Sequence, residues 1–222
     1  MTTNPASGTE HGLDPRAALA AMGQSAAATR AAIGPNPAII YFVWAAAYLI
    51  GYGLLHGANF GWLPLPYGTA LIIGGIILLL AIAYTAIISI RSGSQIRGDS
   101  TFAGLAYGMS WMAGFLIVAL FSMALAKLFS TLLPHADALQ IGWLINAVAI
   151  LVVSLMYMLG AALFGDRTMF ILGACFTVLN AAALLAGPSG FISIFAIGGP
   201  ILLIIAGTAT LISRRRVLPV VK

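Results

Sequence analysis

The amino-acid sequence predicts an all-α polytopic membrane protein, a bundle of six transmembrane helices preceded by an amphipathic cytoplasmic helix. Of its 222 residues, 61% are hydrophobic and 7% are charged, and the mean hydropathy is +1.05. A soluble domain carries about 25% charged residues, so this composition cannot build a water-facing surface. Six apolar stretches each reach the roughly 20 residues that a helix needs to cross a bilayer, and most charges fall between them.

Residues 1–37 are predicted to form a cytoplasmic tail that contains one short helix, at about 14–33. Asp14 suits the N-cap and Pro15 the first helical position, and the prolines of the segment 34–37 end the helix. Its apolar stripe is narrow, which suits the membrane surface or a partner helix; a cytosolic segment without a partner is the alternative. The stripe consists of Leu19, Met22, Ala26 and Ile33, interrupted by Thr29.

The membrane domain is predicted to cover residues 38–213, followed by a basic cytoplasmic tail at 214–222. Lys127 is expected to close the third span, and a loop is expected at about 128–140. Short links are predicted at 165–168 and 187–190, where glycine, proline and polar residues cluster. The six spans are expected at about 38–58, 67–90, 102–126, 141–164, 169–187 and 191–213.

The distribution of basic residues predicts the orientation, because Lys and Arg favour the cytoplasmic side of a membrane. With six spans, nine of the ten basic residues lie on one side, and Lys127 lies on the other. Both termini are therefore expected to lie in the cytoplasm. The protein itself is expected in the plasma membrane of a bacterial cell. This placement of basic residues at the cytoplasmic side also explains the net charge of +5, so the charge does not indicate that the protein binds nucleic acid. The nine residues are Arg16, Arg30, Arg91, Arg97, Arg167, Arg214, Arg215, Arg216 and Lys222.

Three polar residues in the outer half of the predicted bundle form a candidate pocket. His56 lies near the outer end of span one, Asn146 about two turns inside span four, and Asn180 just past the middle of span five. If the three side chains face inward, they form a small polar site. His56 would then be the only residue of that site of a type that titrates near neutral pH. The alternative is ordinary interhelical hydrogen bonding. No charged residue lies at mid-depth in a span, which argues against a proton pump.

Glycine motifs mark two further places in the predicted bundle. Gly198, Gly199 and Pro200 lie within span six, where proline removes a backbone hydrogen bond, so we expect either a hinge or a static kink. Gly104 and Gly108 form a GxxxG motif in span three, which permits close helix packing within the chain or between two copies of it.

The sequence contains no motif that indicates an enzyme. It has no phosphate-binding loop, dinucleotide fingerprint, zinc-binding helix or nucleophile elbow. Its one cysteine, Cys175, lies in an apolar stretch and cannot form an internal disulfide. We therefore predict no enzyme, no cofactor and no metal site. The expected partners are the lipid bilayer and, as open alternatives, a second copy of the chain or a cytosolic protein.

Several short motifs are spread over most of the chain: Tyr41 with Trp44, and the segments 96–98, 106–111, 155–167 and 170–174. Together they resemble a family of uncharacterised actinobacterial integral membrane proteins that are often labelled as transporters. That resemblance implies a six-span fold without a defined substrate, and the description of family members beside winged-helix regulator genes implies a membrane partner or signalling role. The chain departs from the family at the first loop and at the link between spans five and six, so details of a pocket do not carry over.

Two functional hypotheses follow. The first is a small transporter or permease-like protein that moves a neutral or weakly polar solute through a pocket near His56, Asn146 and Asn180. The second is a membrane sensor or scaffold that does not transport and that binds a partner through the 14–33 helix and the 91–101 loop.

Overall fold

The computed structural model describes residues 14–33, 36–93, 100–132 and 138–217, and these form seven helices. Six of the helices, α2 to α7, are long and apolar enough to cross a membrane, which confirms the predicted all-α polytopic fold. The tail before residue 14, most of the predicted 91–101 loop and residues 218–222 of the basic tail lie outside the described residues. The helices are α1 (Pro15–Ile33), α2 (Pro37–Asn59), α3 (Tyr67–Gly93), α4 (Ser100–Leu132), α5 (Ala138–Phe164), α6 (Arg167–Leu185) and α7 (Gly187–Val217).

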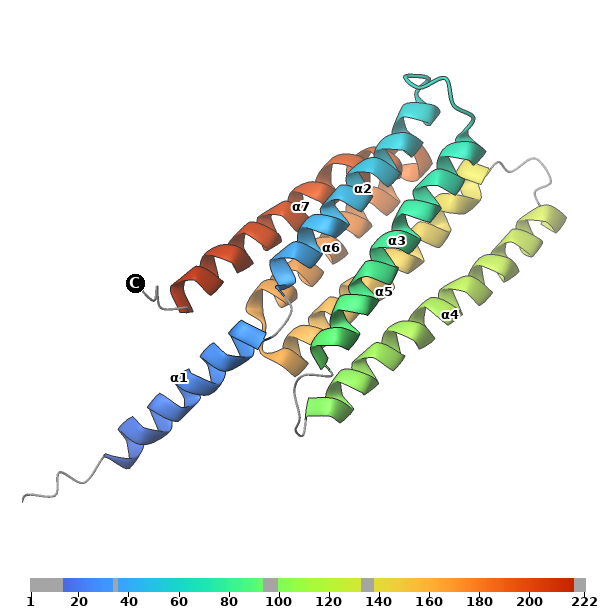
Figure 1. The fold of residues 1–222 in the computed structure, drawn as a ribbon. Helices are drawn as coiled ribbons and strands as arrows, with labels where there is room; N and C mark the ends of the chain where they lie inside the picture. Colours follow the sequence, from blue (N-terminus) through green and yellow to red (C-terminus); the bar gives the residue numbers. More distant parts are fainter. Residues whose placement is uncertain (1–13, 34–35, 94–99, 133–137, 218–222) are drawn as a thin grey trace, which may run out of the picture.

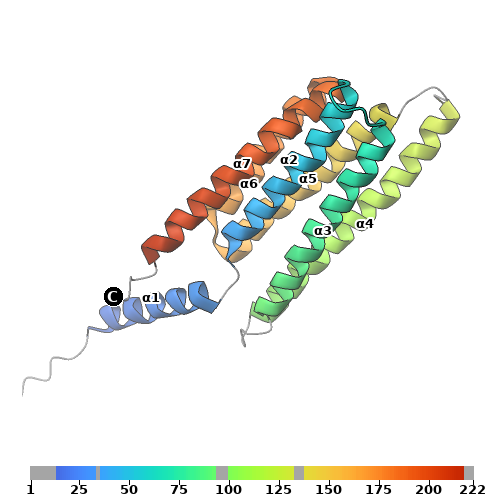
Figure 2. The ribbon, with the colours of Figure 1, turned by 45° about the horizontal axis from the view of Figure 1, so that its top comes forward.

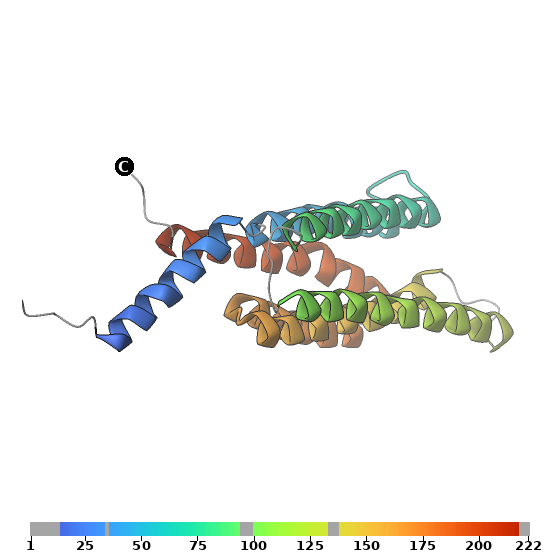
Figure 3. The ribbon, with the colours of Figure 1, turned by 60° about the horizontal axis from the view of Figure 1, so that its bottom comes forward.

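The six membrane helices form two layers that α7 joins. Figure 3 shows α2 and α3 in one layer and α4, α5 and α6 in the other, with α7 crossing between them. The main helix contacts agree, because α7 packs on α2 and on α6, α3 packs on α2, and α4 packs on α5. Helix α1 extends away from the bundle in Figures 1 and 2. The two outlying helices, α3 and α4, therefore expose most of their surface.

Local capping explains where two of the spans begin. The Asn36 side chain accepts a hydrogen bond from the backbone N–H of Ala38 at 3.2 Å, and Pro37 follows as the first residue of α2. The Asp166 carboxylate accepts hydrogen bonds from the N–H groups of Thr168 and Met169 at 2.8 and 3.2 Å, which begins α6. Gly165, with φ of +68°, makes the tight turn between α5 and α6, a conformation that glycine adopts without strain.

Two predicted boundaries are wrong. Lys127 does not close the third span, because α4 continues to Leu132 and α5 already begins at Ala138, so the predicted 128–140 loop is largely helical. A lysine near a helix end can extend its charge toward the membrane surface, so it does not mark the end of a helix.

The segment 187–190 is the first turn of α7, and the link between α6 and α7 is Ala186 alone. Gly187, with φ of +76°, turns the chain, and Pro188 occupies a position near the helix start that tolerates proline.

The core of the bundle is a set of aromatic rings between α2, α5, α6 and α7. The Tyr48 and Tyr52 rings lie 5.3 Å apart, and Tyr52 stacks on Phe195 at 5.4 Å between ring centroids. Phe176 lies edge-on to Tyr48 at 5.9 Å. Such pairs contribute about 0.5–1.5 kcal/mol beyond the area they bury. The cluster thus joins α7 to three other helices.

Glycines bring several helices close together, but the predicted GxxxG motif does not. A Cβ built on Gly173 of α6 would lie 2.8 Å from the backbone oxygen of Ser154 in α5. A Cβ on Gly74 of α3 would lie 3.5 Å from the Cα of Gly51 in α2. Around Gly104 and Gly108 no atom lies within 4 Å of such a Cβ. The motif has no packing role within the described chain, and a role between two copies of it stays a prediction.

We expect Gly173→Ala to destabilise the protein by about 1–3 kcal/mol, because the added methyl group meets backbone atoms of α5 that cannot move independently of the helix. Thermal unfolding of the purified protein in detergent measures the effect. Gly108→Ala is the matched control and should leave the unfolding temperature nearly unchanged. Equal losses in the two variants would contradict this account of the packing.

Candidate functional site

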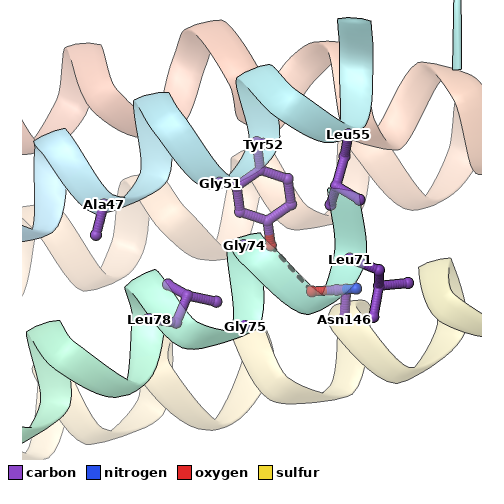
Figure 4. Close-up of a pocket in the computed structure, with 9 residues that line it drawn as sticks. All are labelled: Ala47, Gly51, Tyr52, Leu55, Leu71, Gly74, Gly75, Leu78 and Asn146. Atoms are coloured by element: carbon purple, nitrogen blue, oxygen red, sulfur yellow. Dashed lines mark hydrogen bonds between the residues drawn. The ribbon is translucent and has the colours of Figure 1, made fainter. Parts of the chain in front are cut away.

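A cavity of about 100 Å³ lies between the two layers, where α2 and α3 face α5 (Figure 4). It contains two polar side chains, Tyr52 from α2 and Asn146 from α5, and no ionisable acid or basic residue. Its lining is Ala47, Gly51, Tyr52, Leu55, Leu71, Gly74, Gly75, Leu78 and Asn146. The cavity therefore has a mainly apolar lining, with its two polar side chains, Tyr52 and Asn146, as the hydrogen-bonding groups.

Tyr52 and Asn146 form a hydrogen bond across the layers, which Figure 4 shows as a dashed line. The Tyr52 hydroxyl donates to Asn146 Oδ1 at 3.1 Å, and Asn146 Nδ2 donates to the Gly142 carbonyl of its own helix at 2.9 Å. An amide nitrogen carries two hydrogens, and its oxygen accepts two bonds. Asn146 therefore has one donor hydrogen and one acceptor position that these two bonds do not use, and it lines the cavity.

Glycines create the space beside this pair. Gly51 and Gly74 lie against each other, so α2 and α3 approach without side chains between them, and Gly75 adds a further position without a side chain. Both Gly51 and Gly74 are about two turns, or about 10–12 Å, from the helix ends that the 60–66 loop joins. The cavity is therefore inside the part of the bundle that spans the bilayer, nearer to the predicted outer face.

Asn180 does not line this cavity. Its side chain is buried, and Nδ2 donates to the Ala147 carbonyl of α5 at 2.9 Å. Its Oδ1 is fully buried and accepts no hydrogen bond from the described residues. Asn180 thus holds α6 to α5 directly behind the Asn146 position, and its contact fits the predicted alternative of interhelical hydrogen bonding.

His56 also lies apart from the cavity, at the end of α2. Its Nδ1 is 3.1 Å from the Ser193 hydroxyl of α7, and that hydroxyl donates to the Ser189 carbonyl at 2.9 Å. Because a hydroxyl has one proton to donate, Ser193 is then the acceptor for the His56 Nδ1–H. The ring contacts Phe60 and Trp62 at centroid distances of 4.5 and 4.8 Å. Among the three predicted residues, Asn146 alone lines the cavity.

The candidate hinge residues take part in helix packing. Helix α7 is continuous across Pro200. A Cβ on Gly198 would lie 2.8 Å from Cδ1 of Leu179 in α6, and one on Gly199 would lie 2.8 Å from Cδ1 of Tyr48 in α2. The two glycines therefore allow α7 to approach both layers, and movement at this point stays a prediction.

The fold and the cavity define a multi-pass membrane protein with a small, uncharged site between its helix layers. Within the part of the chain that the structure describes, no group of three His, Cys, Asp or Glu side chains could hold a metal ion. Comparisons with protein-family models, with curated proteins and with solved structures found no match to this chain. The function must therefore be argued from the cavity itself.

Sequence reasoning missed Tyr52 and the glycines as parts of the site. Tyr52 follows Tyr48 by one helical turn, and that spacing places both rings on one face of the helix but does not indicate a hydrogen-bond partner 94 residues away. Gly51 and Gly74 are almost equally distant from the loop between α2 and α3, so two antiparallel helices would place them opposite each other. This symmetry is a signal that could have located the cavity.

A double-mutant cycle of Tyr52→Phe and Asn146→Leu should give a coupling free energy of about 0.6–1.7 kcal/mol, the range that interhelical hydrogen bonds contribute in membranes. Equilibrium unfolding in mixed micelles provides the measurement. Tyr48→Phe is the control, because the Tyr48 hydroxyl forms no hydrogen bond with a described residue, and its coupling to Asn146→Leu should be near zero. If the coupling free energy between Tyr52→Phe and Asn146→Leu is also near zero, the two side chains do not form this hydrogen bond.

Proposed function

We propose that the protein is a small transporter or permease-like protein for a neutral or weakly polar solute. The observation that carries this proposal is the cavity, which combines apolar walls with one hydrogen-bonded pair of polar side chains, Tyr52 and Asn146, at membrane depth. Ligand sites typically have this character, with mostly apolar linings and a few polar groups that orient the ligand. Its position between two helix layers also suits a solute path, because layers of a bundle can shift against each other.

The chemistry of the lining favours an uncharged solute. An ion in this cavity would lose its hydration without a charged partner, and the lining offers only the Tyr52 hydroxyl and the Asn146 amide. The volume also restricts the ligand, since an apolar protein cavity of about 150 Å³ holds one benzene molecule. A site of about 100 Å³ suits a molecule, or a molecular fragment, of a few non-hydrogen atoms.

A second candidate function, that of a sensor or scaffold, is favoured by one observation on α1. Leu19 and Met22 of this helix are each 69% exposed, and α1 has no extensive contact with the bundle among the described residues. A helix with exposed apolar side chains can lie on a membrane surface or bind a partner helix. This candidate does not need the cavity, so the two functions can be tested separately.

Gly75→Leu tests the transport proposal, because a Cβ on Gly75 meets no atom within 4 Å and the larger side chain would fill the cavity. We expect the permeability of proteoliposomes to the transported solute to fall about tenfold or more, as a loss of about 1.4 kcal/mol in binding would produce. Stopped-flow light scattering with glycerol, urea, acetamide and short alcohols measures permeability.

Gly68→Leu is the matched control for this experiment. Gly68 lies on the same helix, is exposed, has no atom near its Cβ position and does not line the cavity. The permeability of proteoliposomes that contain the Gly68→Leu variant should equal that of proteoliposomes with the wild type. If wild-type protein conducts no solute of this panel above protein-free vesicles, or if Gly75→Leu conducts as well as the wild type, the proposal is wrong.

Deletion of residues 1–33 tests the sensor or scaffold candidate. If α1 binds a partner, the shortened chain should still insert and unfold as the full chain does but lose the cytosolic proteins that co-purify with it. Affinity purification with quantitative mass spectrometry compares the two. A full chain with Leu19→Glu and Met22→Glu keeps the helix and removes its apolar contacts, so it should show the same loss. Recovery of identical partners from all three proteins would eliminate this candidate.

A further inference from the structure

We infer that the cavity takes its ligand laterally from the bilayer, and that the ligand is an uncharged amphiphile with one hydrogen-bonding group on an apolar chain. The inference rests on the proposed function for the identity of the site, and it adds the class of ligand and the direction of entry.

The exposure of the cavity lining indicates where the cavity opens. The α2 residues Gly51 and Tyr52 are buried and form its floor, whereas Leu71 of α3 is 42% exposed. Gly75 and Leu78, on the same side of α3, are partly exposed. The opening therefore lies along the flank of α3.

That flank faces lipid. Ile72 and Leu79 of α3 are each 65% exposed, and they lie next to lining residues in sequence. Helix α3 packs mainly on α2, so its remaining surface meets the bilayer. With Gly74 about 10 Å from the helix start and a hydrocarbon core about 30 Å thick, the opening is at the depth of lipid chains.

An apolar loop joins α2 and α3 at the end of the bundle nearest the cavity. Residues 60–66 contain no charged side chain, and the loop folds back on α2, where the N–H groups of Trp62 and Leu63 donate to the Gly57 carbonyl at 2.8 and 3.1 Å. The Leu63 side chain fills the space above Gly57, where a Cβ would lie 2.7 Å from its Cδ1. A ligand that approaches from water meets these side chains first, whereas a ligand dissolved in the bilayer meets the opening directly.

The polar pair determines the chemistry of the ligand. The remaining donor and acceptor of Asn146 fit a hydroxyl or a carbonyl group, and the apolar walls fit the carbon atoms next to it. A cavity of about 100 Å³ cannot contain a whole lipid. The hydrogen-bonding end therefore occupies the cavity, and the chain stays among the lipids along α3. A charged headgroup is excluded, because it would be buried without a counter-charge.

Photo-labelling of the full chain in phosphatidylcholine nanodiscs tests this inference. The probe is hexadecan-1-ol with a diazirine beside the hydroxyl end, and labelled residues are identified by peptide mass spectrometry. We expect labelling to concentrate in residues 47–55 and 71–78, several-fold above that of the lipid-facing part of α4 at 109–123. The same chain ending in trimethylammonium should not label the cavity. Uniform labelling of all lipid-facing helices by the alcohol would overturn the inference.

Variants separate specific binding from simple lipid contact. Gly75→Leu should abolish the excess labelling, and Gly68→Leu should retain it. Asn146→Leu should reduce labelling by the alcohol but not by hexadecane with the diazirine at the same carbon. Labelling is independent of transport, so a labelled cavity without solute flux would overturn the proposed function and support this inference. Flux without excess labelling would overturn this inference alone.

Discussion

The bundle depends on close contact between helices, because the hydrophobic effect does not drive helices together within a bilayer. Backbone groups in hydrocarbon must be satisfied inside each helix, so only side-chain packing and a few interhelical hydrogen bonds remain to hold the layers. In this chain α7 contributes more of that contact than any other helix. Gly198 and Gly199 allow it to approach α6 and α2, and the stacked rings of Tyr52 and Phe195 fill the centre. The packed core accordingly lies around α7.

The cavity has the same physical origin as the packing. Where glycines oppose large side chains, as Gly199 opposes Tyr48, they allow dense contact between helices. Where Gly51 opposes Gly74, neither helix supplies a side chain, and the space beside them stays open. The hydrogen bond between Tyr52 and Asn146 crosses the layers at this point, so the open space and the polar contact coincide. A site of this kind needs no charged residue, and the chain has none at that depth.

The sequence was sufficient to predict the six spans. It was insufficient to predict which face of each span packs against which neighbouring helix. Apolar length determines whether a helix crosses a membrane, so all six spans were identified, with errors where Lys127 was expected to close a span and residues 187–190 were expected to form a link. Which residues meet depends on rotation and tilt of each helix, which an almost uniformly apolar span does not encode. Of the three predicted pocket residues, Asn146 lines the cavity, whereas His56 and Asn180 form hydrogen bonds with α7 and α5 elsewhere.

The position of α7 also has a consequence for biosynthesis. The ribosome produces this helix after α2 to α6, yet α7 is the helix through which the two layers are joined. Until α7 enters the bilayer, the α2–α3 pair and the α4–α6 group are held mainly by their own contacts. We therefore expect the layers to assemble as separate units in the order of translation and the core to close only after the sixth span has been inserted.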